Sequence, residues 1–236
     1  MTISPFRLAL ILAGSAALAA CGGSEEPAAE ETTAAEDTEQ RTASAEPEML
    51  QAPEGSQAAD AMVIGSPDAP LTVVEYASVT CPGCAAFHNN TFGAIKEQLI
   101  ETGQVRFEFR ELPTAPRREA FAGFILARCS ATTTGPQSYF AVIDALFKRQ
   151  NAWVRGPNRG QELRNIAVQA GLDDTGFEEC FRRQDIRDAI QGNIDLAREN
   201  NVSGTPTFFI DGERFELPFN PEEAVAALTA EVEKRR

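Results

Sequence analysis

Two cysteines separated by two residues, directly after an apolar run, constrain the fold of this chain more than any other feature. Residues 73–77 have the β-branched and aromatic content of a buried strand. Cys81-Pro82-Gly83-Cys84 follows after a short break. Pro82 suits the first position of a helix, because its missing N–H would have no intrahelical partner there. The sequence therefore predicts a strand, a turn and a helix that begins at the cysteine motif.

The positions of the two cysteines predict a redox-active dithiol. Cys81 is expected at the helix N-terminus, where free N–H groups and the helix dipole favour a thiolate. Cys84, about one turn further along, is expected to be more buried and placed to attack a mixed disulfide formed at Cys81. One alternative is a zinc site with His88 as a third ligand, although the chain has no second Cys-x-x-Cys and no other histidine. Another is a structural Cys81–Cys84 bridge, whose small loop would add little stability.

The N-terminus has the pattern of an export signal. Arg7 precedes an uncharged stretch, residues 8–20, which is too short to span a bilayer and is typical of a signal-peptide core. The stretch ends in Leu18-Ala19-Ala20-Cys21, which resembles the lipobox of bacterial lipoproteins. The resemblance implies a signal peptide at 1–20, lipidation of Cys21 and a membrane anchor. The alternative is an ordinary secretory signal cut near Ala20. Either signal exports the protein to an oxidising compartment.

Residues 21–60 are predicted to be a disordered acidic tether. From residue 22 this segment has no aromatic side chain and carries eleven acidic residues against Arg41 alone, a net charge of −10. Such a composition cannot bury enough apolar surface to order itself. Because the whole chain carries −14, the remainder is only mildly acidic, and nothing indicates nucleic acid as a partner. The tether has no heptads that would predict a dimerisation stalk, so we expect a monomer.

The cysteine count predicts a second, structural disulfide. The chain has five cysteines. With Cys21 lipidated and the motif pair reactive, Cys129 and Cys180 remain. A bridge between them would close a loop of roughly 50 residues and contribute on the order of 3–4 kcal/mol in the loop-entropy picture. The alternative is two unpaired, buried thiols.

Apolar periodicity predicts an α/β chain with the order β-α-β, a helical block, then β-β-α. The helical block covers about 114–200, and a loop at 152–159 that contains Trp153 is expected to be an ordinary surface loop. The expected strands are 71–77, 104–112, 207–210 and 213–217; the expected helices include 81–102, 118–131, 137–150 and one that begins at Pro221.

Three separated pieces of the chain carry a specific resemblance. They are the motif Cys81-Pro82-Gly83-Cys84, the acid Glu75 six residues before it, and Gly204-Thr205-Pro206 some 120 residues after it. Together they resemble the thioredoxin fold with an inserted helical domain, as in the DsbA-like thiol:disulfide oxidoreductases of bacterial envelopes. The resemblance covers roughly residue 63 to the C-terminus, within an expected thioredoxin-like domain at 61–236.

The resemblance implies roles for these residues. Cys81 exchanges disulfides, Cys84 resolves the mixed disulfide, and Glu75 is a buried acid that moves a proton; the alternative for Glu75 is a carboxylate at a strand edge. Pro206 is expected to be cis and, with Thr205, to dock the substrate. No metal and no organic cofactor is implied. For His88, packing or hydrogen bonding is favoured over catalysis.

The implied function is oxidation of exported proteins that are unfolded or contain thiols, at the periplasm-facing side of the cell envelope, with a DsbB-like membrane protein as recycling partner. Gly83 departs from the pattern, since strongly oxidising members carry a histidine there that helps to hold the thiolate. The direction of exchange is therefore open, and a reductase or isomerase is the second candidate. A holdase or adaptor without redox chemistry is the third.

Overall fold

The computed structural model describes residues 58–236, and five strands within them form one sheet in the order β1-β3-β2-β4-β5. The predicted signal peptide, the lipidation site Cys21 and nearly all of the predicted tether lie outside the described residues. Strands β2 and β3 are parallel, and every other neighbouring pair is antiparallel. The strands are β1 (Met62–Ile64), β2 (Leu71–Ala77), β3 (Val105–Glu111), β4 (Thr207–Ile210) and β5 (Glu213–Phe215).

The central strand β2 places a carboxylate in the middle of the sheet. Alternate side chains of a strand face opposite sides, so Glu75 lies on the same face as Val73 and Leu71. Glu75 pairs with Phe109 of β3 and Phe208 of β4, and it is completely buried. It is therefore not at a strand edge, and its partners on the two neighbouring strands are both phenylalanines.

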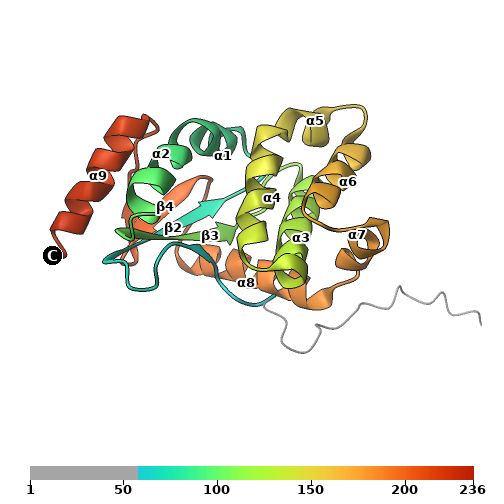
Figure 1. Ribbon diagram of the computed structural model, residues 1–236, viewed down its shortest axis with the longest axis horizontal. Coiled ribbons are helices and arrows are strands. Elements are labelled where there is room, and N and C mark those ends of the chain that lie inside the picture. The colour runs from blue at the N-terminus through green and yellow to red at the C-terminus, as the bar shows by residue number, and fades with distance from the viewer. Residues whose placement is uncertain (1–57) are drawn as a thin grey trace, which may run out of the picture. The chain divides into compact units, whose positions relative to one another are not determined.

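A long irregular helix follows β2 and covers this face together with the C-terminal helix (Figure 1). It begins as predicted at the cysteine motif, with Cys81 as the N-cap, and ends at Ile100, two residues earlier than expected. The structure is α1 (Pro82–Phe87), a π-helical turn (His88–Phe92), α2 (Gly93–Ile95), a second π-helical turn (Lys96–Ile100) and, at the end of the chain, α9 (Pro221–Glu233).

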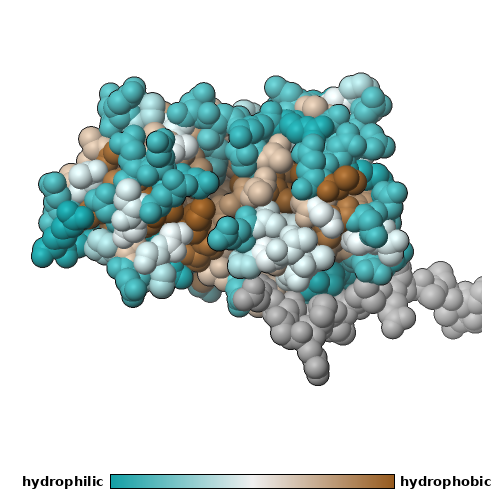
Figure 2. All heavy atoms as spheres, viewed as in Figure 1, coloured by the Kyte–Doolittle hydropathy of each residue, from teal (hydrophilic) through white to brown (hydrophobic). Residues whose placement is uncertain are grey.

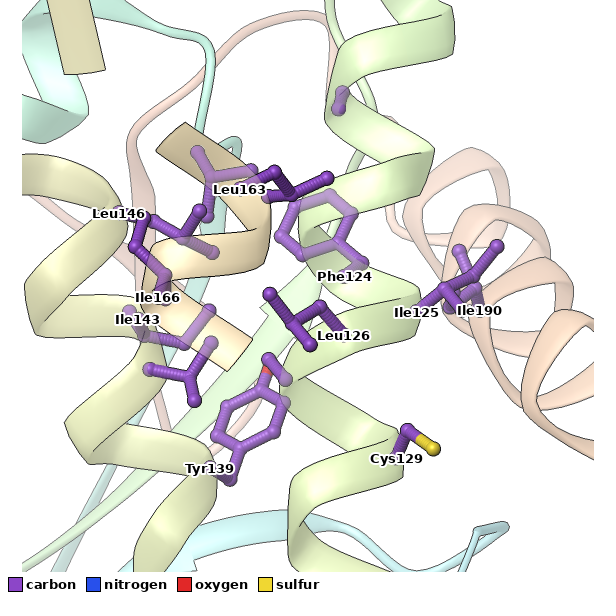
Figure 3. Packing of buried hydrophobic residues seen from close by; sticks show 14 of the residues in the cluster. Phe124, Ile125, Leu126, Cys129, Tyr139, Ile143, Leu146, Leu163, Ile166 and Ile190 are labelled. Carbon is purple, nitrogen blue, oxygen red and sulfur yellow. The ribbon is translucent and has the colours of Figure 1, made fainter. Parts of the chain in front are cut away.

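Six helices between β3 and β4 form the predicted helical block. Figure 3 shows its core: Leu126 of α3 faces the side of α4 and α6, while Ile125 lies against Ile190 of α8. Among the described residues, α8 also contacts β3, which ties the block to the sheet. The helices are α3 (Arg117–Thr134), α4 (Gln137–Lys148), α5 (Gln150–Arg155), α6 (Arg159–Gln169), α7 (Asp174–Cys180) and α8 (Gln184–Glu199).

Two expectations about local structure were wrong. The segment 152–159 was expected to be a surface loop, but its first half is helical, and Trp153 is 1% exposed and donates its indole N–H to the Leu146 carbonyl at 2.8 Å. Burial of the indole in the helical core favours a helix up to Arg155, and Gly156, Pro157 and Asn158 form the turn that follows. Strand β1 was missed, because three residues are too few for an alternating pattern.

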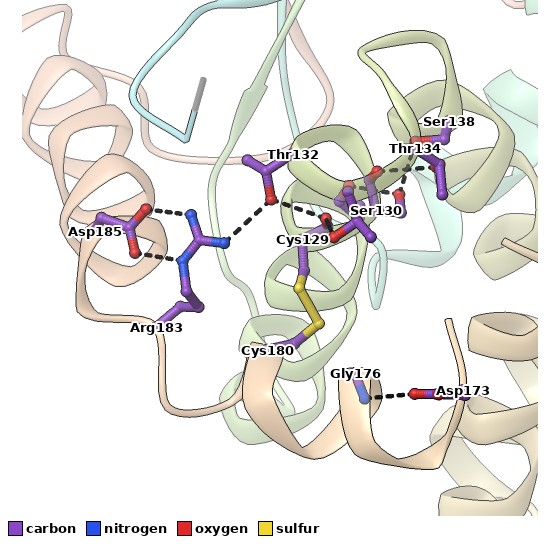
Figure 4. Close-up of a disulfide and its surroundings, with 12 residues drawn as sticks. Cys129, Ser130, Thr132, Thr134, Ser138, Asp173, Gly176, Cys180, Arg183 and Asp185 are labelled. Carbon is purple, nitrogen blue, oxygen red and sulfur yellow. Dashed lines mark hydrogen bonds and ion pairs between the residues drawn. A yellow bond between two sulfur atoms is a disulfide. The ribbon is translucent and has the colours of Figure 1, made fainter. Parts of the chain in front are cut away.

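Cys129 of α3 and Cys180 of α7 form a disulfide with an S–S distance of 2.01 Å (Figure 4). Next to it, Arg183 donates to Thr132 of α3 at 3.2 Å and to Asp185 of α8 at 2.7 Å. The bridge and the guanidinium therefore connect α3, α7 and α8.

A buried ion pair joins the sheet to the helical block. Arg128 of α3 holds Glu111 of β3 through two hydrogen bonds, and Tyr139 of α4 donates to the same carboxylate at 2.9 Å. Asn193 of α8 also donates to Glu111. Arg128 further donates to the Asp60 carbonyl at 3.1 Å and to the carbonyl of Ala58, which is buried. Residues 58–60, which the sequence placed in the tether, thus contact the folded domain. No helix within residues 58–236 is long and apolar enough to cross a membrane.

Candidate active site

The turn between β2 and α1 places the two motif cysteines at different depths. Cys81 caps α1 and is partly exposed, whereas Cys84, in the first turn, has no exposed surface. Gln150 of α5 donates its side-chain amide to the carbonyls of Val79 and Cys81, at 2.9 and 3.0 Å, and thereby fixes the turn. Neither periodicity nor the resemblance pointed to Gln150, because a polar residue at a helix start is common.

The surroundings of Cys81 favour its thiolate. The pKa of Cys81 is lowered from the ordinary 9.0 to about 5. The main cause is a hydrogen bond from the Cys84 thiol, and the Thr205 side chain and the backbone N–H groups of Cys84 and Gly83 act in the same direction, against the effect of burial. Because Gly83 has no side chain, these groups provide the stabilisation that a side-chain donor would otherwise add. At neutral pH the exposed sulfur is therefore an anion.

The opposite holds for Cys84. Burial raises the pKa of the Cys84 thiol well above its ordinary value, and the hydrogen bond to Cys81 and the charge of Glu75 raise it further. The Ser78 N–H, 3.5 Å from Sγ, acts in the opposite direction and favours the thiolate. The two cysteines are thus a partly exposed thiolate and a buried thiol. Cys84 therefore needs a base before it can act as a nucleophile.

The loop before β4 forms the wall opposite Cys81. The Thr205–Pro206 peptide bond is cis. In the thiol form, Sγ of Cys81 donates to the Thr205 carbonyl at 3.3 Å, across 124 residues of sequence. A Cβ atom on Gly83 would lie 3.5 Å from Cδ of Pro206, which is ordinary contact. The structure thus brings the predicted residues together at one site, which we call the mouth of the active site: Cys81, Gly83, Thr205 and Pro206.

Glu75 lies on the inner side of the dithiol and is paired with the lone histidine. Oε2 of Glu75 is 2.8 Å from Nε2 of His88, and both side chains are buried. The imidazole also stacks on Phe147 of α4, with ring centroids 4.4 Å apart. Its Nε2 atom is thus engaged by Glu75 and not by the cysteines. Among the residues that the structure describes, no group of three or more His, Cys, Asp or Glu side chains could hold a metal ion.

The family follows from comparison with known proteins. The thioredoxin family model matches residues 57–230, which is most of the chain. The chain belongs to the thioredoxin family. Within this family it is a DsbA-like member, since the crystal structure of Wolbachia pipientis alpha-DsbA1 superimposes with a TM-score of 0.64 and 26% identity, over 75% of this chain and 92% of that one. The predicted thioredoxin fold with an inserted helical block is confirmed for the described residues.

Relatives by sequence carry names from the same chemistry. A Rickettsia bellii protein provisionally named a protein-disulfide oxidoreductase is 30% identical over 156 residues, 66% of this chain and 58% of its own length. Disulfide bond formation protein D of Bacillus subtilis is 25% identical over 153 residues, 63% of this chain and 67% of its own. The chain thus spans little more than half the length of the Rickettsia relative.

Proposed function

We propose that this protein is a thiol:disulfide oxidoreductase of the bacterial cell envelope that oxidises exported proteins. One observation carries the proposal: the partly exposed Cys81, whose pKa is lowered to about 5, lies next to Thr205 and Pro206, and the buried thiol of Cys84 lies behind it. A dithiol whose reduced form is stabilised in this way gives up its disulfide readily, and is therefore an oxidant. The names of its relatives in Rickettsia and Bacillus support the same chemistry.

Oxidation of a client proceeds through a mixed disulfide. A client thiolate attacks Sγ of Cys81 in the Cys81–Cys84 disulfide, and the electron pair of the broken S–S bond goes to Sγ of Cys84. Cys84 then takes a proton from Glu75, since a thiolate in this buried position is unstable. A second client thiolate attacks the client sulfur of the mixed disulfide and releases Cys81 as the stabilised thiolate. The products are an oxidised client and the reduced dithiol.

The loop at Thr205 and Pro206 docks the client. The backbone of Thr205 lies beside Cys81, where an extended chain can pair with it as an added strand would. Such recognition uses the client backbone, and it therefore suits unfolded proteins of many sequences. Neither a metal nor an organic cofactor takes part.

We further propose that Cys21 is lipidated and anchors a monomer to a membrane, facing the periplasm. A DsbB-like membrane protein reoxidises the dithiol. The lipobox-like sequence before Cys21 and the acidic segment after it support the anchor. An anchored oxidase meets its clients as they emerge from export, and the tether gives the domain reach above the surface.

The equilibrium of the Cys81–Cys84 pair with glutathione tests the direction of exchange. If this protein is an oxidant, its dithiol is mostly reduced in a glutathione buffer in which thioredoxin is mostly in the disulfide form. A reduction potential near that of thioredoxin would instead favour the reductase. Oxidation of a reduced, unfolded client by stoichiometric protein then tests the activity. The variant Cys81→Ser loses it if the protein is a redox enzyme, whereas an adaptor keeps its client binding.

A further inference from the structure

The buried thiol of Cys84 has no direct path for its proton. Cys84 has no exposed surface, and of the two motif cysteines Cys81 alone is in contact with the outside, where a client covers it when the mixed disulfide forms. Each cycle nevertheless adds one proton at Cys84 and later removes it. The proton must therefore pass through the interior on the side away from the client.

Glu75 has one carboxyl oxygen engaged and one without a partner. Oε2 is bonded to His88, whereas Oε1 is buried and has no hydrogen-bond partner among the described residues. A buried polar atom without a partner is costly, and such atoms are rare unless they have a function. Glu75 is close enough to Cys84 for its charge to raise the pKa of that thiol.

His88 connects this carboxyl group to a second opening in the surface. It lines a groove of about 910 Å³ between the π-helical turns and α2 on one side and α4 on the other, to which β1 also contributes lining residues. Figure 2 shows apolar atoms in the hollow between the surface over α2 and the surface over α4. Cys81, Thr205 and Pro206 are absent from the described residues that line the groove, so a docked client leaves it open.

We propose that Glu75 and His88 form a proton path from Cys84 to this groove, in which His88 carries the proton between the carboxyl group and groove water. The inference rests on the proposed function and adds a proton route to it. His88 is a positioning residue and not a catalytic one, because it touches Glu75 and neither sulfur. Its neighbours Phe147 and Phe92 hold the ring in place, with centroids at 4.4 and 4.7 Å.

The steps balance with one proton taken from the groove. When the S–S bond breaks, Sγ of Cys84 takes a proton that Oε1 of Glu75 supplies through one intervening water, because the two atoms are not in direct hydrogen-bond contact. Nε2 of His88 gives its proton to Oε2, and Nδ1 takes up a proton from water in the groove. In the reverse direction Glu75 accepts the Cys84 proton and His88 releases one to the groove, which leaves Cys84 as a thiolate able to attack the mixed disulfide. No electron passes through the pair.

Few other charges act on the pair. Tyr139 of α4 is the neighbouring phenol, and its hydroxyl is committed to Glu111 of β3, which Arg128 of α3 neutralises. The charged side chains of the groove wall form ion pairs with each other. Lys96 of the second π-helical turn pairs with Glu101, which follows that turn, and Lys148 pairs with Asp144 on α4. His88 is therefore the titratable group in the wall that contacts Glu75.

The variant His88→Gln tests the path, because the glutamine amide nitrogen can donate to Glu75 as Nε2 does but cannot carry a proton. The reduced protein is mixed with oxidised glutathione. In the first step Cys81 attacks, which needs no proton transfer at Cys84; in the second, Cys84 attacks the mixed disulfide. We expect the first rate to stay within about twofold and the second to fall about tenfold at pH 7, which is less than the roughly 10²–10⁴-fold of a direct acid–base group because His88 acts through Glu75. Asn89→Ala, in the same wall of the groove, is the matched control and keeps both rates.

A second measurement uses the wild-type protein and does not depend on the variant folding. Since His88 is the only histidine in the chain, its ring gives a single resonance in a histidine-labelled NMR sample. We expect the chemical shift of that resonance to differ between the disulfide and dithiol forms at the same pH, and the difference to disappear in Glu75→Gln.

The outcomes separate the two proposals. A second step that is equally fast in His88→Gln and in the wild type, or a histidine resonance that is identical in both redox forms from pH 5 to 9, overturns the proton path and leaves the proposed function intact. A wild-type protein that forms no mixed disulfide with glutathione overturns the proposed function, and the proton path with it.

Discussion

The guanidinium of Arg128 binds the carboxylate of Glu111 in the interior, with Nε 2.6 Å from Oε1 and Nη2 2.9 Å from Oε2. Both side chains are almost fully buried, and two further donors, from Tyr139 and Asn193, complete the shell of the carboxylate. Four elements thus meet at one carboxylate: β3, α3, α4 and α8.

Removal of the Arg128 guanidinium should destabilise the fold strongly. Arg128→Met leaves the Glu111 charge buried without its counter-ion, and we expect a loss of about 3–5 kcal/mol in the free energy of unfolding, measured by urea denaturation. The double variant Arg128→Met with Glu111→Leu removes both charges and should recover much of this loss. A double variant no more stable than Arg128→Met would show that the charge is not the cause.

The thiolate of Cys81 should make the stability of the reduced protein depend on pH. Its pKa is about 5 when folded and near 9 when unfolded, so the unfolded chain holds the proton more tightly. The stabilisation is complete above pH 9 and is lost as the pH falls through 5. We therefore expect the unfolding free energy of the reduced form, relative to the oxidised form, to rise from pH 5 to pH 9. Cys81→Ser has no thiolate at this position, and its unfolding free energy should not show this contribution between pH 5 and pH 9.

The same pKa can be read directly. Absorbance of the thiolate near 240 nm, followed from pH 3 to 9 in the reduced protein, should show a transition with a midpoint near 5.

The variant Cys84→Ser should trap clients as mixed disulfides at Cys81. Its hydroxyl replaces the Cys84 thiol, which is the strongest hydrogen-bond donor to the Cys81 thiolate. No trapped client on a non-reducing gel would speak against Cys84 as the resolving residue.

Gly83→His should make the dithiol more oxidising. The space beside Pro206 admits a Cβ atom, and an imidazolium there adds a charge-assisted hydrogen bond to the thiolate. One such bond, at about 1.5 kcal/mol, shifts the equilibrium with glutathione roughly tenfold toward the reduced dithiol. Gly83→Ala, which adds only the methyl group, is the control. Equal shifts in the two variants would exclude the hydrogen bond as the cause.

Loss of the structural disulfide should cost stability without loss of chemistry. Cys129→Ala with Cys180→Ala opens a loop with a sequence separation of 51, and we expect about 2–4 kcal/mol lower unfolding free energy. The pH midpoint of the Cys81 thiolate titration should not change, because the disulfide joins α3 to α7 and contributes no group that acts on Cys81. A shifted midpoint would show that the helical block and the active site are coupled.

The extent to which sequence predicted the site depends on how far each signal reaches. Cys81, Cys84 and Pro82 form a local pattern with a physical explanation, so periodicity and helix capping located them. Thr205 and Pro206 act across 124 residues, and only the family resemblance connected them to Cys81.

Tertiary contacts explain what the sequence left open. Trp153 follows helical residues and precedes loop-forming ones, and its burial against Leu146 decides the structure in a way that no local rule contains. Gln150 donates to two carbonyls of a turn far away in sequence. The pairing of His88 with Glu75 depends on how the helix after β2 packs across that strand, and the sequence around the two residues does not specify this packing.

Arg128 also decides where mechanical load enters the domain. Its guanidinium holds the carbonyls of Ala58 and Asp60, the first residues described, so a pull on the chain from the N-terminal side meets helix α3 before it reaches the short edge strand β1. The three residues of β1 are consequently protected from separation from β3. A force applied along the chain at Ala58 acts on the whole domain and not on its edge strand alone.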